Sequence, residues 1–377
     1  MATGGMANVI HSLPYKSDWL VGIGLAFFFL NLCLFAINCV MITLRFILHP
    51  GSLIRSFYDQ VESLFISAII VSIATILITI TQYGTPNTGP WLLHVLEICF
   101  WIYTGVSVLV SAGLYLALWS TQIFPIHTMT PVWVFPAYPL LLSAPLASNI
   151  LKAAVNNTPA VAATATESTP PPPVGMIRIA LAAVAVQGTG YLISFMVCSA
   201  FLYRLMTQKL PRDHQRPGVF ISIGPSGFTC AGLVQLGLLA PNIFPAEGSA
   251  FATAVAGARG NPEVVATILR LLTYMAGLWL WGLSLWFFVV SVGSLWKYLR
   301  PESKGKLRFQ MTWFSFVFPN TALVTATEAL GAAFDSNGLK IFGCVLAGCL
   351  VFVWLLVFSR MIRHLWRKKL LWPKDED

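Results

Sequence analysis

The sequence predicts an all-α integral membrane protein with ten transmembrane helices. Of its 377 residues, 57% are hydrophobic and only 10% are charged, and the mean hydropathy is +0.75. Soluble domains carry about 25% charged residues, so most of this protein's surface must face lipid. The apolar residues are also gathered into runs of about 20 residues or more, the length that a helix needs to cross the hydrocarbon core.

Nine of the ten segments are full-length apolar runs. In order they are 19–47, 62–83, 91–119, 129–152, 175–206, 218–241, 264–298, 311–331 and 339–362. A shorter apolar segment, 1–13, precedes them and is too short to cross alone, so we interpret it as the second half of an N-terminally truncated first helix. Residues 1–364 then form a single transmembrane transporter or channel domain, and 365–377 form a charged cytoplasmic tail.

The net charge of +9 is distributed unevenly along the chain. Most of the 23 basic residues lie near the C-terminus or beside the loops that follow the second, sixth and eighth segments, whereas the opposite loops are nearly neutral. Basic loops remain on the cytoplasmic side. Both termini are therefore predicted to be cytoplasmic, which requires an even number of crossings and supports ten rather than nine.

Neither catalysis nor nucleic-acid binding is indicated. The basic residues form no aromatic-and-basic stripe for single strands, and the seven cysteines lack metal-ligand spacing. The sequence Gly-Pro-Ser-Gly at 224–227 matches an intramembrane serine protease pattern, but that chemistry needs a histidine on a later inner helix. The only later histidine is His364, in the basic tail. We therefore expect no enzymatic activity, no cofactor, no metal and no nucleic-acid partner.

The odd-numbered segments share a local pattern, which is an internal repeat at the level of helix pairs. An aromatic or small residue is followed by proline and then by small and hydroxyl residues, as in 135–139, 223–229 and 316–321. The third segment has Phe65-Ile66-Ser67 without the proline. The even segments are mostly Leu, Phe, Val and Trp. This alternation predicts inner odd helices around a polar axis and an outer, lipid-facing ring of even helices.

The small and hydroxyl residues of the odd segments permit two interpretations. They allow close helix packing, and Ser and Thr can bond their own backbone. Alternatively, prolines bend these helices around a lumen in which neutral donors bind an anion weakly enough to let it leave. The candidate pore-lining residues are Thr3, Gly4, Gly5, Ser67, Ser143, Ser148, Asn149, Ser226, Thr229, Asn320, Thr321 and Thr325.

Two ionisable residues are candidate functional groups. Arg45, at the end of the second segment, either reaches lipid headgroups or attracts a substrate at the cytoplasmic mouth. Glu328, near the outer end of the ninth segment, either carries a proton or shapes the mouth. Ionisable residues within membrane-spanning segments are costly, so each is a candidate for function.

Four stretches of the sequence resemble the fungal malic acid transport proteins. They are 216–229, 313–321, 45–51 and the ending 374–377, and the resemblance covers nearly the whole chain. These carriers are grouped with bacterial tellurite-resistance/dicarboxylate transporters, fungal sulfite efflux pumps and plant slow anion channels.

The resemblance implies five helical hairpins around a pseudo-fivefold central pore, often in a homotrimer. It also implies that a phenylalanine of the ninth helix blocks the pore. The matching residue is Phe318, which could otherwise be a simple core residue. Malate-type members usually have Phe-Phe-Pro at Phe65-Ile66-Ser67 and often Gly-Pro-Pro at Gly224-Pro225-Ser226, so this chain lacks two prolines beside the expected lumen.

The function predicted from these observations is plasma-membrane transport of small organic anions, foremost C4-dicarboxylates such as malate. The alternatives are a sulfite efflux pump and a channel for chloride or nitrate with the same fold. A receptor that binds a ligand without flux is a fourth hypothesis.

Overall fold

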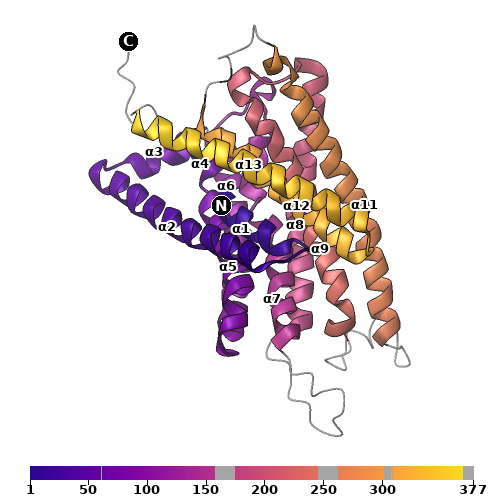
Figure 1. The fold of residues 1–377 in the computed structure, drawn as a ribbon. Helices are drawn as coiled ribbons and strands as arrows, with labels where there is room; N and C mark the ends of the chain where they lie inside the picture. Colours follow the sequence, from indigo (N-terminus) through magenta and orange to yellow (C-terminus); the bar gives the residue numbers. More distant parts are fainter. Residues whose placement is uncertain (61, 158–174, 245–261, 301–306, 308, 368–377) are drawn as a thin grey trace, which may run out of the picture.

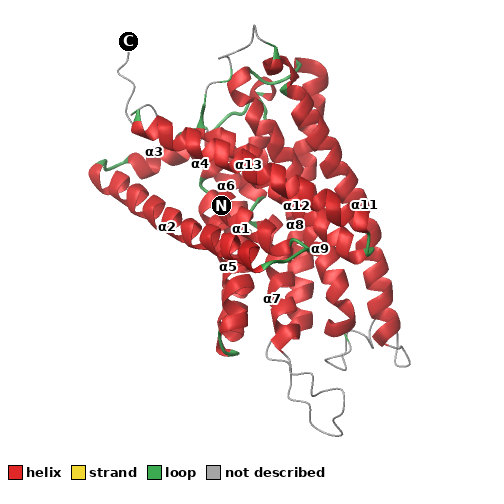
Figure 2. Cartoon of the chain, in the orientation of Figure 1, coloured by secondary structure: helices red, strands yellow, loops and turns green. Residues whose placement is uncertain are grey.

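The computed structural model describes residues 1–60, 62–157, 175–244, 262–300, 307 and 309–367, and every regular element in these ranges is a helix (Figure 2). The α-helices are α1 (Ala2–Ser12), α2 (Asp18–Leu48), α3 (Ser52–Tyr58), α4 (Glu62–Phe65), α5 (Ala68–Gly84), α6 (Trp91–Thr121), α7 (Ser143–Asn157), α8 (Met176–Gln208), α9 (Ile223–Ile243), α11 (Pro262–Ser294), α12 (Phe318–Ala333) and α13 (Asn337–Trp366). The prediction of an all-helical protein is confirmed.

Short 3-10 helices precede or connect several of these elements. They are η1 (Thr85–Asn87), η2 (Ile126–Thr128), η3 (Pro131–Ala137), η4 (Leu140–Leu142), η6 (Asp213–Ser222), η8 (Trp296–Leu299) and η10 (Met311–Phe316).

Among the described residues, seven helices are long and apolar enough to cross a membrane. The count rises to eight when η3 and the segment Leu140–Asn157, which meet at 70°, are taken as one bent span. The protein is therefore a multi-pass membrane protein. The other two predicted segments are present as shorter helices, α1 with 11 residues and α12 with 16. The helix α13 continues two residues past the predicted domain boundary at 364, and 368–377 of the predicted tail lie outside the described residues.

Burial divides the helices into two groups. In the most apolar part of the span 213–243, 89% of the residues are buried, and every residue of α12 from Phe318 to Gly331 is buried. The corresponding fraction is only 17% in α2, 22% in α11, 28% in α8 and α13, and 33% in α6. The odd-numbered predicted segments thus supply the interior, and the even-numbered ones supply the apolar surface that suits lipid.

The buried helices contact one another in a closed sequence. In order, α1 packs on α5, α5 on α7, α7 on α9, α9 on α12, and α12 again on α1. We call these five helices the inner ring. Figure 1 shows α5, α7 and α9 standing upright, with α2 and α13 running obliquely across them.

Glycines allow the ring helices to approach closely. A Cβ atom added at Gly4 would lie 2.9 Å from Thr75 Oγ1 of α5, and one at Gly5 would lie 3.0 Å from Thr321 Oγ1 of α12. At Gly227 of α9 it would lie 2.8 Å from Ala322 Cβ of α12. Small residues of this kind let membrane helices pack backbone to backbone, so Gly4 and Gly5 serve contacts between ring helices.

Four ring helices begin at a break in the chain. A 3-10 helix leads into α7, α9 and α12, and Pro145, Pro225 and Pro319 lie in the first turns of these α-helices. The first N–H groups of a helix have no partner within it. These prolines therefore remove no hydrogen bond and mark helix starts.

The fourth break needs no proline. The helices α4 and α5 are separated at Ile66-Ser67, where the sequence has no proline. The Ser67 hydroxyl donates to the carbonyl oxygen of Phe135 at 2.9 Å, which ties this break to the segment before α7. The helix of the third segment is thus interrupted at a serine rather than at a proline.

Candidate functional site

Three buried aromatic rings meet between α9, α12 and the segment before α7. They belong to Phe318, the first residue of α12, to Phe228 of α9, and to Tyr138, which lies between η3 and η4. The ring centroids are 5.3 Å apart for Phe228 and Phe318, 6.0 Å for Tyr138 and Phe318, and 6.4 Å for Tyr138 and Phe228. Phe318 is 2% exposed. The cluster therefore fills the space where three segments of the inner ring converge.

A hydrogen bond and a close backbone contact fix Tyr138 in this cluster. Its hydroxyl donates to the carbonyl oxygen of Ile221 at 2.6 Å. A Cβ atom added at Gly224 would lie 2.2 Å from the same hydroxyl oxygen, so only glycine fits there. Tyr138 is thus held against the start of α9, while Phe318 has ring contacts alone. Of the three rings, only that of Tyr138 is restrained by a hydrogen bond.

Most of the predicted pore-lining hydroxyl groups bond the backbone of their own helix. Thr229 donates to Pro225 at 2.7 Å, Thr321 to Phe318 at 2.6 Å and Thr325 to Thr321 at 2.9 Å, and Ser226 donates to Ile223 at 3.3 Å. This is the backbone-bonded state that the packing interpretation describes. A hydroxyl must rotate away from its carbonyl before it can donate to an anion.

Three other candidate positions have different surroundings. The hydroxyl of Ser143 and the side-chain carbonyl oxygen of Asn320 are buried without a hydrogen-bond partner among the described residues. Thr3 is also buried, in α1. Ser143 and Asn320 are the candidates with an uncommitted polar atom inside the protein.

Amide side chains link the ring helices, and most of them were missed by the sequence analysis. The Gln82 amide nitrogen of α5 donates to Asn8 of α1 at 2.6 Å and to Asn149 of α7 at 2.9 Å. The Ser148 hydroxyl donates to Gln235 of α9 at 2.7 Å. The signal that could have found Asn8, Gln82 and Gln235 is an amide residue inside an apolar run.

Thr229 is also linked to an outer helix. The Gln187 amide nitrogen of α8 donates to the Thr229 hydroxyl oxygen at 2.9 Å, and its carbonyl oxygen accepts from the Ala144 backbone at 3.1 Å. Thr229 thus belongs to a polar contact between α8 and α9.

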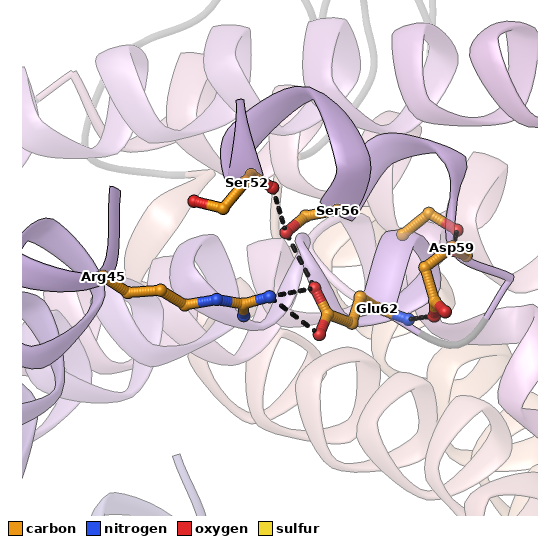
Figure 3. A network of polar contacts seen from close by, with 6 residues as sticks. Arg45, Ser52, Ser56, Asp59 and Glu62 are labelled. Carbon is orange, nitrogen blue, oxygen red and sulfur yellow. Dashed lines mark hydrogen bonds and ion pairs between the residues drawn. The ribbon is translucent and has the colours of Figure 1, made fainter. Parts of the chain in front are cut away.

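Arg45 is engaged in an ion pair at the end of α2 (Figure 3). Its guanidinium nitrogen Nη2 lies 3.1 Å from both carboxylate oxygens of Glu62. The Ser56 hydroxyl donates to the same carboxylate at 2.7 Å, and Asp59 accepts from the Glu62 backbone N–H at 2.8 Å. The side chains of Arg45 and Glu62 are 47% and 44% exposed. The positive charge of Arg45 is therefore largely compensated.

Glu328 lies at the contact between α12 and the outer helix α13. It is 5% exposed, and its oxygen Oε1 has no hydrogen-bond partner among the described residues. A Cβ atom added at Gly343 of α13 would lie 2.2 Å from this oxygen. Ten residues separate Glu328 from Phe318, which is about 15 Å along a helix. The structure therefore does not bring the carboxyl group together with the aromatic cluster.

Comparison with known proteins identifies the family. Residues 1–362 match the family of voltage-dependent anion channels, SLAC1. The chain belongs to this family. The family and the relatives described below are anion channels, transport proteins and pumps, which is consistent with a protein that is not an enzyme.

The relatives of this SLAC1 family member include both carrier types expected from the sequence. The malic acid transport protein of Schizosaccharomyces pombe is 27% identical, over 100% of this chain and 79% of that protein. A putative malic acid transport protein of the same yeast is 29% identical, over 100% and 80%. The sulfite efflux pump SSU1 of Trichophyton rubrum is 25% identical, over 95% and 87%. The resemblance to fungal malic acid transport proteins is confirmed.

Proposed function

We propose that the protein carries small organic anions, foremost C4-dicarboxylates such as malate, along the axis of the inner ring. The observation that carries this proposal is the closed ring of five helices, two of which, α9 and α12, contribute Phe228 and Phe318 to the aromatic cluster. We further propose that ten segments form five hairpins in the plasma membrane, with both termini in the cytoplasm. The uneven distribution of basic residues supports this orientation.

In this mechanism Phe318 is the gate. Its ring packs on Tyr138 and Phe228 and closes the axis, and rotation of the Phe318 side chain opens it. Hydroxyls of Ser226, Thr321 and Thr325 then turn from their own backbone carbonyls toward the anion. The free-energy cost is small, because each hydroxyl exchanges a backbone carbonyl for the anion as its hydrogen-bond acceptor. Because these donors are neutral, the anion is bound weakly enough to leave.

The direction of transport follows from charge and proton coupling. A membrane potential that is negative inside favours anion exit by about 2.3 kcal/mol per charge per 100 mV. Import therefore requires a compensating charge, and we propose that Glu328 carries a proton for this purpose. Its burial without a partner beside Gly343 supports the choice, because an ionised carboxylate is costly in such a place.

Two other substrates are candidates. Sulfite is favoured by the similarity to the SSU1 pump over 95% of the chain. Chloride or nitrate is favoured by the match to the voltage-dependent anion channels. We also propose assembly as a homotrimer, which the family resemblance suggests and which native mass spectrometry of the detergent-solubilised protein would test.

The proposal is tested by flux measurements in yeast that lacks its own dicarboxylate carriers. Radiolabelled malate, succinate and sulfite are supplied at two external pH values, and both uptake and release are measured. Malate flux above that of vector-only cells is the expected result. If malate and succinate move in neither direction while sulfite does, the sulfite pump replaces the present proposal.

A further inference from the structure

Two lysines and a histidine gather where α1, α5 and α7 end. His11 lies in α1, Lys16 in the connection between α1 and α2, and Lys152 in α7. Burial and, second, the nearby charge of Lys152 lower the pKa of Lys16. No ion pair joins Lys16 or Lys152 to an acidic group in the described part of the chain, not even to Asp18. This end of the ring is opposite to the basic loops, so the positive-inside pattern does not explain the cluster.

A cavity of about 190 Å³ opens beside these charges. Its polar lining includes His11, Lys16 and Asn87, and its apolar wall includes Ile10, Val21 and Pro86. Liquid water occupies about 30 Å³ per molecule. The cavity therefore has room for several water molecules or for one small organic anion.

The surroundings of the cavity are built by hydrogen bonds. Gln82, which also lines it, is 7% exposed and donates both to Asn8 of α1 and to Asn149 of α7. Lys152 follows Asn149 by one turn of the same helix. The amide link therefore fixes α7, and with it Lys152, relative to the α1–α2 connection that carries Lys16.

The imidazole ring of His11 has a fixed neighbour as well. It packs edge-on against Tyr83 with ring centroids 5.3 Å apart. The Tyr83 hydroxyl in turn donates to the carbonyl oxygen of Ala7 at 3.0 Å. His11 is thus held at the cavity wall, between α1 and the end of α5.

Cations held together without acidic partners repel one another, and an anion between them removes that repulsion. A cleft lined by charge of one sign also concentrates the opposite ion. We propose that this cavity is an external binding site for a small organic carboxylate. One carboxylate group pairs with Lys16, which lines the cavity, and a second reaches out toward Lys152, which lies beyond the lining; the carbon chain lies on the apolar wall. An inorganic oxyanion has no carbon chain that could pack against the apolar wall.

The role of this binding site rests on the proposed transport function: the site would supply the inner ring with substrate from outside. The binding itself can be measured without transport. The purified full chain in detergent is titrated with L-malate by calorimetry, and the titration is repeated with Lys16→Gln, with Lys152→Gln and with sulfite. Lys340→Gln is the matched control, because Lys340 already pairs with Asp335.

Loss of one charged hydrogen-bond partner is expected to weaken malate binding about tenfold in each lysine variant. Lys340→Gln should bind malate as the native chain does, and sulfite should bind the native chain more weakly than malate. The site is rejected if the native chain binds no malate. It is also rejected if both lysine variants bind malate with unchanged affinity.

Uptake kinetics separate this site from the transport function. In cells, Lys16→Gln and Lys152→Gln should raise the KM for external malate severalfold and leave the maximal rate within about twofold. If the native chain binds malate but carries no dicarboxylate, the transport proposal fails and the site stands. If it transports malate and the KM of both variants matches that of Lys340→Gln, the site fails and the transport proposal stands.

Discussion

The ring of Phe318 packs 5.3 Å from that of Phe228, and each residue lies near the start of its ring helix. Phe318 opens α12 directly after the 3-10 helix η10, and Pro319 occupies the same first turn. The junction between the two kinds of helix therefore sets where the Phe318 side chain lies. A change at this one side chain should alter the closure of the ring more than its architecture.

Replacing Phe318 by alanine should open the axis of the inner ring. The variant loses its ring contacts with Phe228 and Tyr138, so we expect large steady anion currents where the native protein gives small ones. Truncation of a buried phenylalanine also costs about 3–5 kcal/mol of stability. Voltage-clamp recording measures the current, and thermal unfolding of the purified protein measures the stability.

Phe201→Ala is the control for this experiment. Phe201 is fully buried in α8 and packs with Met129 and Val219, outside the aromatic cluster. Its truncation should lower stability to a similar extent without raising the current. Equal currents from Phe318→Ala and Phe201→Ala, at equal surface expression, would identify Phe318 as a core residue only.

A methyl group at Gly227 should separate α9 from α12. The added carbon would lie 2.8 Å from Ala322 Cβ and 2.9 Å from its backbone carbonyl carbon, and a backbone cannot move aside as a flexible side chain can. Overpacking of this kind costs about 1–3 kcal/mol, so Gly227→Ala should lower the unfolding temperature and reduce anion flux.

Gly348→Ala provides the comparison for that prediction. Gly348 lies within α13 and would place its new methyl group in open space. Alanine favours helix over glycine by about 1 kcal/mol, so this variant should be as stable as the native chain or slightly more stable. A normal unfolding temperature in Gly227→Ala would show that α9 and α12 have room for a methyl group between Gly227 and Ala322.

The long apolar helices could be predicted from the sequence because hydropathy and length alone decide whether a helix suits lipid. The inner position of the odd segments could also be predicted, since their small and hydroxyl residues contrast with the Leu- and Phe-rich even segments. The break at Ile66-Ser67 shows the limit of motif reasoning. The third segment lacks the proline of the other odd segments, yet its helix is interrupted there as well, and Ser67 bonds to the carbonyl oxygen of Phe135.

The polar links between ring helices could not be predicted. Gln82 and Asn149 are 67 positions apart, and no local sequence pattern predicts that their side chains form a hydrogen bond. Their contact depends on the rotation of α5 and α7 about their axes, which the packing of the complete ring determines. The same holds for Glu328. Its position in the sequence suggested a proton carrier or a residue that shapes the mouth, but no pattern in the sequence indicated that its side chain lies beside Gly343 of an outer helix.

Neutralising Glu62 should change anion attraction and leave stability almost unchanged. Exposed ion pairs contribute about 0–1 kcal/mol, and both partners of the Arg45–Glu62 pair are nearly half exposed. Glu62→Gln leaves the charge of Arg45 uncompensated. We expect a lower KM for anions that enter from the predicted cytoplasmic side, and this gain should fade at high salt.

Efflux from preloaded cells and flux from inside-out vesicles measure that KM. The double variant Arg45→Gln, Glu62→Gln has the same net charge as the native pair, so it should return the KM toward the native value. A loss of folded protein in Glu62→Gln alone would instead indicate that the network of Ser56, Asp59 and Glu62 holds α3 and α4 in place.

Replacing Glu328 by glutamine should remove the dependence of uptake on external pH. The two side chains have nearly the same shape, so the contact with Gly343 is kept, but glutamine cannot gain or release a proton. Native uptake of malate should rise as external pH falls, because the proton compensates the charge of the anion. In Glu328→Gln this rise should vanish while release driven by the membrane potential persists.

Glu97→Gln is the control, since Glu97 of α6 accepts a backbone hydrogen bond from Gly175 that glutamine can also accept. Protonation of malate itself acts equally on all variants. Retention of the native pH response in Glu328→Gln would exclude this carboxyl group as the proton carrier.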